Sequence, residues 1–272
     1  MHIQNCSIVP INSEHAVKAV FFVCELGANL SAEKITEILA HYEQSSSLRN
    51  LFPKKTEGRA TSFTITPEGV GVAPPNGEIN SLVFERVGTD GSVEYSLSLQ
   101  NNIVNFSTNK YSRWATVSSE AFAILSEIIN LVLPAPGVSV FGLQYIDEFI
   151  VTGEIQSFTP SMLFDENSVI LPKNLSTKKA PWHNHFGWFD DDASLSPNKV
   201  LHNLNINVIP QHEKLIVQIL GAHRFILAAP IFNGEQIVAD MANRFTTLHN
   251  QNKALLRGLL NAKAQNEIHL EN

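Results

Sequence analysis

Two tight-turn sequences limit the fold of this chain more than any other feature. Asp90-Gly91 and Asn101-Asn102 separate three segments with strand character, at residues 81–87, 93–99 and 103–107. Glycine, asparagine and aspartate tolerate the positive φ angles of two-residue hairpins, so the three segments are expected to form an antiparallel meander. A parallel arrangement is excluded here, because parallel neighbours need a long crossover connection.

Residues 203–208 show a second clear pattern, in which asparagine alternates strictly with an aliphatic residue. Successive side chains of a strand point to opposite faces of the sheet. The alternation therefore predicts a strand that places Leu204, Ile206 and Val208 on the core face and the three asparagines on the other face.

The remaining strands are indicated by β-branched and aromatic residues between turn signals. They are expected at residues 17–26, 60–66, 138–151, 214–220 and 223–228. Gly221 and the polar residues that follow it predict a turn between the last two of these strands.

Three segments repeat apolar residues with a helical period. The first covers residues 31–42, with Ser31 as the N-cap, and the second covers residues 118–131 before two prolines. The third is long, from about residue 235 to 260, and Asn233 is its expected cap.

Runs of strands separated by single helices predict an α+β fold: a mainly antiparallel sheet with helices packed on one face and a long C-terminal helix. The 272 residues are 44% hydrophobic and 17% charged, which is typical of a packed globule. We expect a single domain over residues 1–272, with sub-halves of about 1–136 and 137–272. Residues 158–197 are rich in proline and lack a period, so an irregular excursion is predicted there.

Charge and cysteine content narrow the functional classes. The formal charge of −7, from 19 basic and 26 acidic residues, argues against binding to nucleic-acid backbones. Cys6 and Cys24 alone cannot build a disulfide framework or a zinc ribbon, which indicates a reducing compartment. The sequence lacks a signal-peptide pattern and any run of about 18 apolar residues. We therefore expect a cytoplasmic protein that does not span a membrane; a homo-oligomer is compatible with these features.

Three short motifs carry a family resemblance. They are Gly142-Leu143-Gln144-Tyr145-Ile146-Asp147, Tyr111-Ser112-Arg113-Trp114 and Leu248-His249-Asn250. They resemble the Gly-Leu-x-Tyr-Ile-Asn/Asp strand, the Tyr-x-x-Trp step and the C-terminal Leu-His helix of a sporadically distributed, functionally uncharacterised prokaryotic family. Asp147 stands where that family often has asparagine, so no chemical role is carried over to it. The resemblance implies no activity, and the family's patchy distribution resembles that of genes on mobile or defence islands.

Aromatic residues gather in one part of the predicted excursion. Trp182, Phe186, Trp188 and Phe189 lie within eight residues. Such side chains either fold back over the sheet, which is the commoner outcome, or contact a protein partner. The cluster is large enough to anchor a partner, and these four residues are the predicted partner-binding site.

The same stretch contains residues that bind metals. His183 and His185 would point the same way on an extended segment, and Asp190 begins a run of three aspartates. With a further ligand such as His202 or His223, they would form an open site for a divalent metal. The ligand set is incomplete within this stretch, so the metal site is the alternative interpretation.

Tyr145 and Asp147 occupy alternate positions of one predicted strand and should form a polar strand face. A buried carboxylate is costly unless it is paired or hydrated, so a polar cavity would explain Asp147. The favoured interpretation is simpler: Asp147 lies at the fraying end of the strand and bonds to a neighbouring turn.

Two functional hypotheses follow. The favoured one is a non-catalytic binding or regulatory protein that engages a protein partner without a cofactor. The alternative is a metal-dependent hydrolase or nuclease that uses His183, His185 and Asp190. The sequence contains no Walker lysine and no Gly-x-Ser-x-Gly elbow, which favours the first hypothesis.

Overall fold

A computed structural model of the chain describes residues 6–59, 63–66, 69–72, 77–175, 177–190 and 192–270. Within these ranges it contains a ten-stranded antiparallel sheet and five α-helices, which confirms the predicted α+β fold. The strand order is β10-β11-β12-β9-β2-β8-β7-β6-β3, and β1 also pairs with β9. The strands of this sheet are β1 Cys6–Pro10, β2 Val17–Leu26, β3 Lys54–Arg59, β6 Ile79–Val87, β7 Val93–Gln100, β8 Ile103–Thr108, β9 Val138–Gly153, β10 Trp182–Phe189, β11 Lys199–Gln211 and β12 Lys214–Ile231.

The chain divides into two compact units that are interleaved in sequence. The first unit consists of Met1–Val20, Gly142–Ile226 and Arg244–Asn272, and the second of Phe21–Phe141 and Leu227–Asn243. These units do not follow the sub-halves expected at 1–136 and 137–272. The reason is that β2, β9, β12 and the helix α4 (Gly234–Leu259) each contribute residues to both units.

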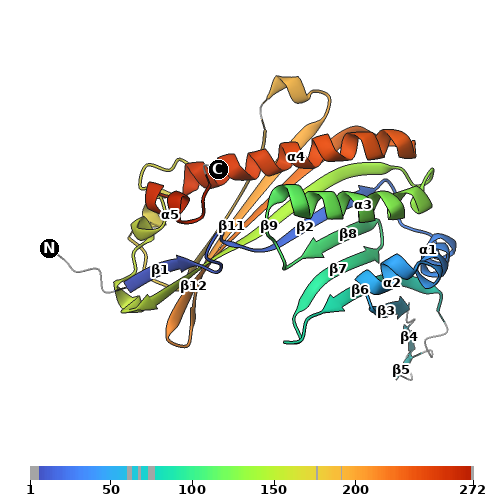
Figure 1. Ribbon diagram of the computed structural model, residues 1–272, viewed down its shortest axis with the longest axis horizontal. Helices are drawn as coiled ribbons and strands as arrows, with labels where there is room; N and C mark the ends of the chain where they lie inside the picture. The colour runs from blue at the N-terminus through green and yellow to red at the C-terminus, as the bar shows by residue number, and fades with distance from the viewer. Residues whose placement is uncertain are drawn as a thin grey trace. The chain divides into compact units, whose positions relative to one another are not determined.

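The second unit contains the predicted meander. β6 pairs with β7, and β7 pairs with β8, both antiparallel. Three helices belong to this unit, α1 Ala32–Gln44, α2 Ser46–Leu51 and α3 Trp114–Val132 (Figure 1). The backbone N–H of Lys34 donates to Ser31 Oγ at 3.2 Å, which confirms the predicted cap of α1.

Several parts of the second unit differ from the sequence-based expectation, among them the strand β3, which was not anticipated. α3 begins at Trp114, four residues before its predicted start, because the Trp114 ring stacks on the buried Phe22 ring at 5.7 Å. The short α2 was not anticipated. The strand predicted at 60–66 is the short β4 (Phe63–Thr66), which pairs with β5 (Gly69–Val72); residues 60–62 lie outside the described residues.

α3 is the one helix in the described ranges that is long and apolar enough to cross a membrane, with a mean hydropathy of 1.3 over 18 residues. Eight of its residues are buried. Core helices of this length and composition meet the same criterion.

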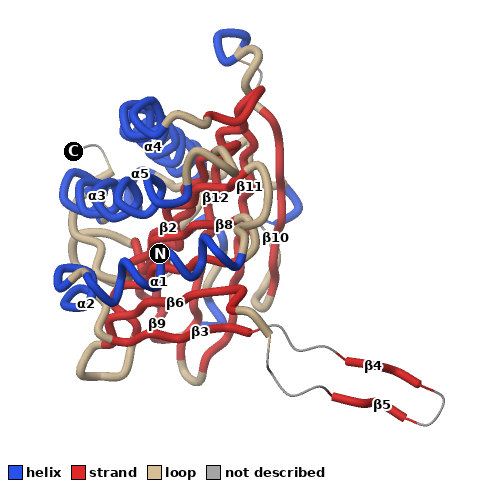
Figure 2. Tube along the Cα trace, turned by 90° about the vertical axis from the view of Figure 1, so that its right-hand side faces the viewer, coloured by secondary structure: helices blue, strands red, loops and turns tan. Residues whose placement is uncertain are grey.

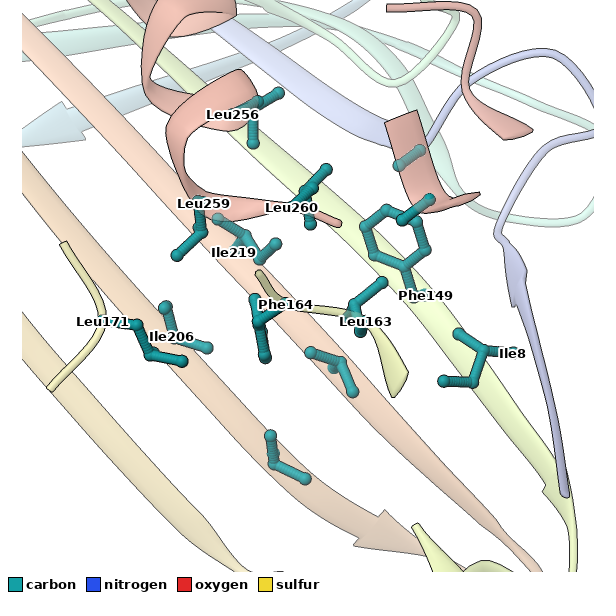
Figure 3. Close-up of a cluster of buried hydrophobic side chains, with 14 of the residues drawn as sticks. Ile8, Phe149, Leu163, Phe164, Leu171, Ile206, Ile219, Leu256, Leu259 and Leu260 are labelled. Atoms are coloured by element: carbon teal, nitrogen blue, oxygen red, sulfur yellow. The ribbon is translucent and has the colours of Figure 1, made fainter. Parts of the chain in front are cut away.

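The first unit has a hydrophobic core between its strands and two helices. Leu204, Ile206 and Val208 of β11 are fully buried, as the alternation predicts. They belong to one cluster with leucines of α4 and with residues of α5 (Ala262–Glu267) and the segment after it. Figure 3 shows Ile206 in this cluster with Leu256 and Leu259 of α4. Asn203, Asn205 and Asn207 lie on the opposite face and are half-buried.

The predicted turn at Gly221 is wrong, because β12 continues through this residue from Lys214 to Ile231. A β-carbon at position 221 would lie 2.4 Å from Asn252 Oδ1 of α4. The glycine therefore permits close approach of a helix side chain to the strand and does not mark a chain reversal.

The predicted irregular excursion is wrong for residues 182–189, which form the strand β10. β10 pairs antiparallel with β11, from Trp182 opposite Val208 to Phe189 opposite Leu201 (Figure 2). The described residues between β9 and β10 do lack long elements and contain three short 3-10 turns, at Ile155–Ser157, Pro160–Met162 and Lys173–Leu175. The sequence obscured β10 because its aromatic residues occur on both faces.

Candidate functional site

β10 is an edge strand without the usual protection against pairing. It is the terminal strand of the sheet, and its eight residues include no lysine, arginine, aspartate, glutamate or proline. In the described part of the chain, no group bonds to the β10 backbone from the side opposite β11. In an antiparallel ladder, alternate residues direct their N–H and C=O groups away from the paired neighbour. Half of the β10 backbone therefore presents unpaired donors and acceptors.

The edge strand at the other end of the strand order, β3, is protected. Four of its six residues are charged: Lys54, Lys55, Glu57 and Arg59. Its pairing with β6 also shifts register at Gly58. Charges and bulges discourage a further strand from pairing, so of the two strands that end this order the neutral and regular β10 is the one that can accept a further strand.

The strand divides the four predicted partner-binding aromatics between two faces. Trp182, Phe186 and Trp188 lie on the core face, whereas Phe189 lies on the outer face with His183 and His185. Trp182 and Trp188 are half-buried and pack against the core of the first unit. Phe186 and Phe189 are 45% and 53% exposed, so they are the aromatic contacts that remain available.

Ring contacts explain why the two tryptophans are covered. Trp188 stacks on Phe186 with ring centroids 5.1 Å apart, and its other neighbour is the ring of His202, also at 5.1 Å. Trp182 lies 6.3 Å from the buried Phe164 ring. The outer-face Phe189 instead has the ammonium of Lys199 above its ring at 5.9 Å.

Two hydrogen-bond donors on the core face of β10 are buried without an acceptor among the described residues. They are Trp182 Nε1 and Asn184 Nδ2. Each buried donor without a partner costs about 1–3 kcal/mol. Among the described residues, the internal strands β8 and β9 each contain one buried polar atom without a hydrogen-bond partner, in Asn105 and Asp147, whereas β10 contains two.

The predicted metal ligands do not converge. His183 and His185 are exposed on the outer face, whereas the carboxylate of Asp190 accepts a hydrogen bond from Gln251 Nε2 of α4 at 3.0 Å. No three His, Cys, Asp or Glu side chains within the described residues are grouped to hold a metal ion; Asp191 lies outside those residues. The metal hypothesis stays a prediction, which the metal content of protein purified without a histidine tag would test.

His202 and His223 form a buried hydrogen-bonded network that the sequence did not reveal as such. His223 Nε2 donates to Asn252 Oδ1 at 3.0 Å. In the neutral ring Nδ1 of His223 is then the acceptor, and it accepts a hydrogen bond from His202 Nδ1 at 2.7 Å. Asp190 Oδ2 lies 3.8 Å from His202 Nε2, which is beyond hydrogen-bond distance. The network links β11, β12 and α4 of the first unit, and the ring of Trp188 packs against its His202.

Burial keeps these histidines uncharged at neutral pH. It lowers the pKa of His223 to about 4, against an opposing contribution from the hydrogen bond with Asn252. Burial also lowers the pKa of His202, although the nearby Asp190 favours its charged form. A neutral, fully buried pair of rings is suited to holding strands and helix together rather than to exchanging protons with a substrate.

Tyr145 and Asp147 lie on the core face of β9, but the strand-end interpretation of Asp147 is wrong. β9 continues to Gly153, and its last five residues pair with β1. Tyr145 Oη lies 2.8 Å from His249 Nδ1 of α4. Asp147 is 2% exposed, its Oδ2 has no partner in the described ranges, and burial raises its pKa to about 7.

No known protein-family model, curated protein or solved structure matches this chain. The resemblance carried by residues 142–147, 111–114 and 248–250 thus stays a prediction. Of the residues in those motifs, the structure brings Tyr145 and His249 together within the first unit.

Proposed function

We propose that this protein is a non-catalytic binding protein which engages a protein partner by accepting an extended segment of that partner alongside β10. The observation that carries the proposal is the free, uncharged and regular edge of β10, next to two exposed phenylalanines. Strand addition is a common mode of peptide recognition, and it requires an exposed sheet edge.

The backbone of β10 would supply most of the affinity and its side chains the selectivity. An added strand would bond the outward N–H and C=O groups of alternate β10 residues. Its own side chains would alternate between the two faces of the sheet, where Phe186 and Phe189 offer one aromatic contact each. Apolar side chains on both faces of the partner strand would therefore bind best.

A non-catalytic role fits the state of the polar groups near this edge. Asp190 is bonded to Gln251, and His202 and His223 are bonded to each other and buried. Neither histidine is placed to activate a water or a substrate, because catalysis by general base needs contact with the reacting group.

Selection from a library of displayed random peptides tests the proposal. We expect the wild-type protein to select extended peptides with alternating apolar residues, and bound peptide to slow hydrogen exchange of β10 amides. Replacing both exposed phenylalanines, Phe186→Lys and Phe189→Lys, should weaken binding of the selected peptides at least tenfold, about 1.4 kcal/mol. The matched control is Val169→Lys, since Val169 is 98% exposed outside β10 and its replacement should leave binding unchanged.

Two outcomes would contradict the proposal. One is peptide binding that leaves β10 exchange unaltered, and the other is equal loss of binding in the phenylalanine variant and the Val169 control. Trp188→Ala is not a suitable test of binding alone. Trp188 covers His202 and packs against the core, so its truncation is expected to lower stability as well.

A further inference from the structure

The residues that flank β10 carry opposite charges at its two ends. Lys178 and Lys179 precede the strand and are exposed. Asp190 and Asp192 follow it, and hydrogen bonds from Ser194 hold the pKa of Asp192 below its usual range, so its carboxylate is ionised at neutral pH. Lys199, whose ammonium lies 5.9 Å from the centroid of the Phe189 ring, adds one positive charge at the acidic end. β10 is therefore an uncharged strand with basic residues before its N-terminal end and acidic residues after its C-terminal end.

We infer that the strand which β10 accepts is β10 of a second copy of this chain, arranged antiparallel about a two-fold axis. This inference rests on the proposed function and names the partner. Antiparallel self-pairing places the basic start of each strand beside the acidic finish of the other, whereas parallel self-pairing would align like charges. The strand itself brings no formal charge into the contact, so nothing within it opposes association.

One register uses both exposed phenylalanines. When Phe186 lies opposite Phe186 of the second copy, Phe189 lies opposite His183 and Gly187 lies opposite His185. Each pair joins two even-numbered or two odd-numbered positions. The two side chains of a pair therefore lie on the same face of the combined sheet. The two-fold dimer then contains one Phe186–Phe186 pair, two Phe189–His183 pairs and two His185–Gly187 pairs, which cover the exposed aromatic surface. This contact is short, so the dimer should dissociate on the order of micromolar concentrations.

Sedimentation of charge-reversed variants tests the antiparallel arrangement. The wild type should show a concentration-dependent equilibrium between monomer and dimer. Lys178→Glu combined with Lys179→Glu should raise the dissociation constant about tenfold, because acidic residues then meet at both ends of the homodimer. Asp192→Lys should raise it less, because it removes the attraction at both ends without making them repulsive. An equimolar mixture of the two variants should associate more tightly than either variant alone, since one end of the mixed dimer regains its opposite charges. Two weakened variants that stay weak when mixed would overturn the inference.

Cysteine crosslinking tests the register. Phe186→Cys should form a disulfide-linked dimer in oxidised glutathione, because directly opposed residues of paired strands bring their α-carbons within disulfide range. The native Cys6 and Cys24 are buried and should not react. Phe189→Cys alone should not crosslink, but it should do so when mixed with His183→Cys. Crosslinking of Phe189→Cys with itself would refute this register.

The two proposals fail in distinguishable ways. A wild type that stays monomeric from nanomolar to millimolar concentrations, but still binds selected peptides at β10, would overturn the self-association and leave strand addition standing. A monomer that binds no strand at β10 would overturn both. A dimer that the selected peptides dissociate would support both.

Discussion

Replacing Gly221 with alanine should destabilise the protein by about 1 to 2 kcal/mol, although the backbone conformation of β12 accepts any residue at this position. The added β-carbon would lie 2.4 Å from Asn252 Oδ1, a separation that real β-carbons do not show. Asn252 is 3% exposed and accepts the hydrogen bond of His223 Nε2, so its amide cannot swing away without breaking that bond.

The magnitude follows from three contributions. Loss of the acceptor for a buried N–H costs about 1–3 kcal/mol. If the Asn252 amide stays in place, this hydrogen bond is kept, and the cost is instead the steric overlap with the added β-carbon, also about 1–3 kcal/mol. Replacing glycine by alanine in a strand interior returns about 0.5–1 kcal/mol through reduced freedom of the unfolded chain.

A double-mutant cycle in urea isolates the contact. Asn252→Ala alone should lower the unfolding midpoint, because it leaves His223 Nε2 without an acceptor. Adding Gly221→Ala to this variant should be neutral or stabilising, since the β-carbon then has room. Gly258→Ala is the matched control: Gly258 lies in α4, where its β-carbon would meet the flexible end of Ile170 at 3.3 Å, and its replacement should stabilise by up to about 1 kcal/mol. If Gly221→Ala costs as much beside Asn252→Ala as in the wild type, the close approach is not the reason for the glycine.

Three further outcomes are expected. Ile206→Asp should cost about 4 kcal/mol or more because it buries an unpaired carboxylate, whereas Asn205→Asp on the other face should be nearly silent; equal melting temperatures would contradict the register. The pKa of His223 is lower in the folded protein, about 4 against 6.5. Its contribution to the free energy of unfolding is therefore complete above pH 6.5 and is lost as the pH falls towards 4. In urea titrations, the free energy of unfolding of His223→Gln should fall less steeply over this pH range than that of the wild type. The pKa of Asp147 shifts the other way, from 3.8 to about 7 in the folded protein. Its contribution to the free energy of unfolding is therefore complete below pH 3.8 and is lost as the pH rises through 7. Asp147→Asn should therefore raise stability at pH 8 more than at pH 4, and an equal effect at both would show that the carboxyl is not buried as the structure has it.

The candidate site was only partly predictable from the sequence. The aromatic side chains of residues 182–189 indicated an interaction surface, but their assignment to an irregular excursion was wrong. The reason is physical: no side chain of this edge strand is fully buried, so its core face tolerates Asn184, its outer face tolerates Phe189, and the period-two signal is lost. The network of His202, His223 and Asn252 has no signal in the sequence either, because its members are 21 and 29 residues apart and meet only when two strands and a helix pack.

The sequence by itself determined the elements in which local chemistry and burial agree. Hairpin residues fixed the meander of the second unit, strict alternation fixed the buried face of β11, and Ser31 fixed the start of α1. Tertiary structure decided what depends on partners distant in sequence. Gly221 resembles a turn residue until α4 approaches it, and Asp147 resembles a strand end until β1 pairs with the rest of β9. The identity of the exposed edge was decided in the same way, because a strand becomes an edge only through the order in which all the strands pair.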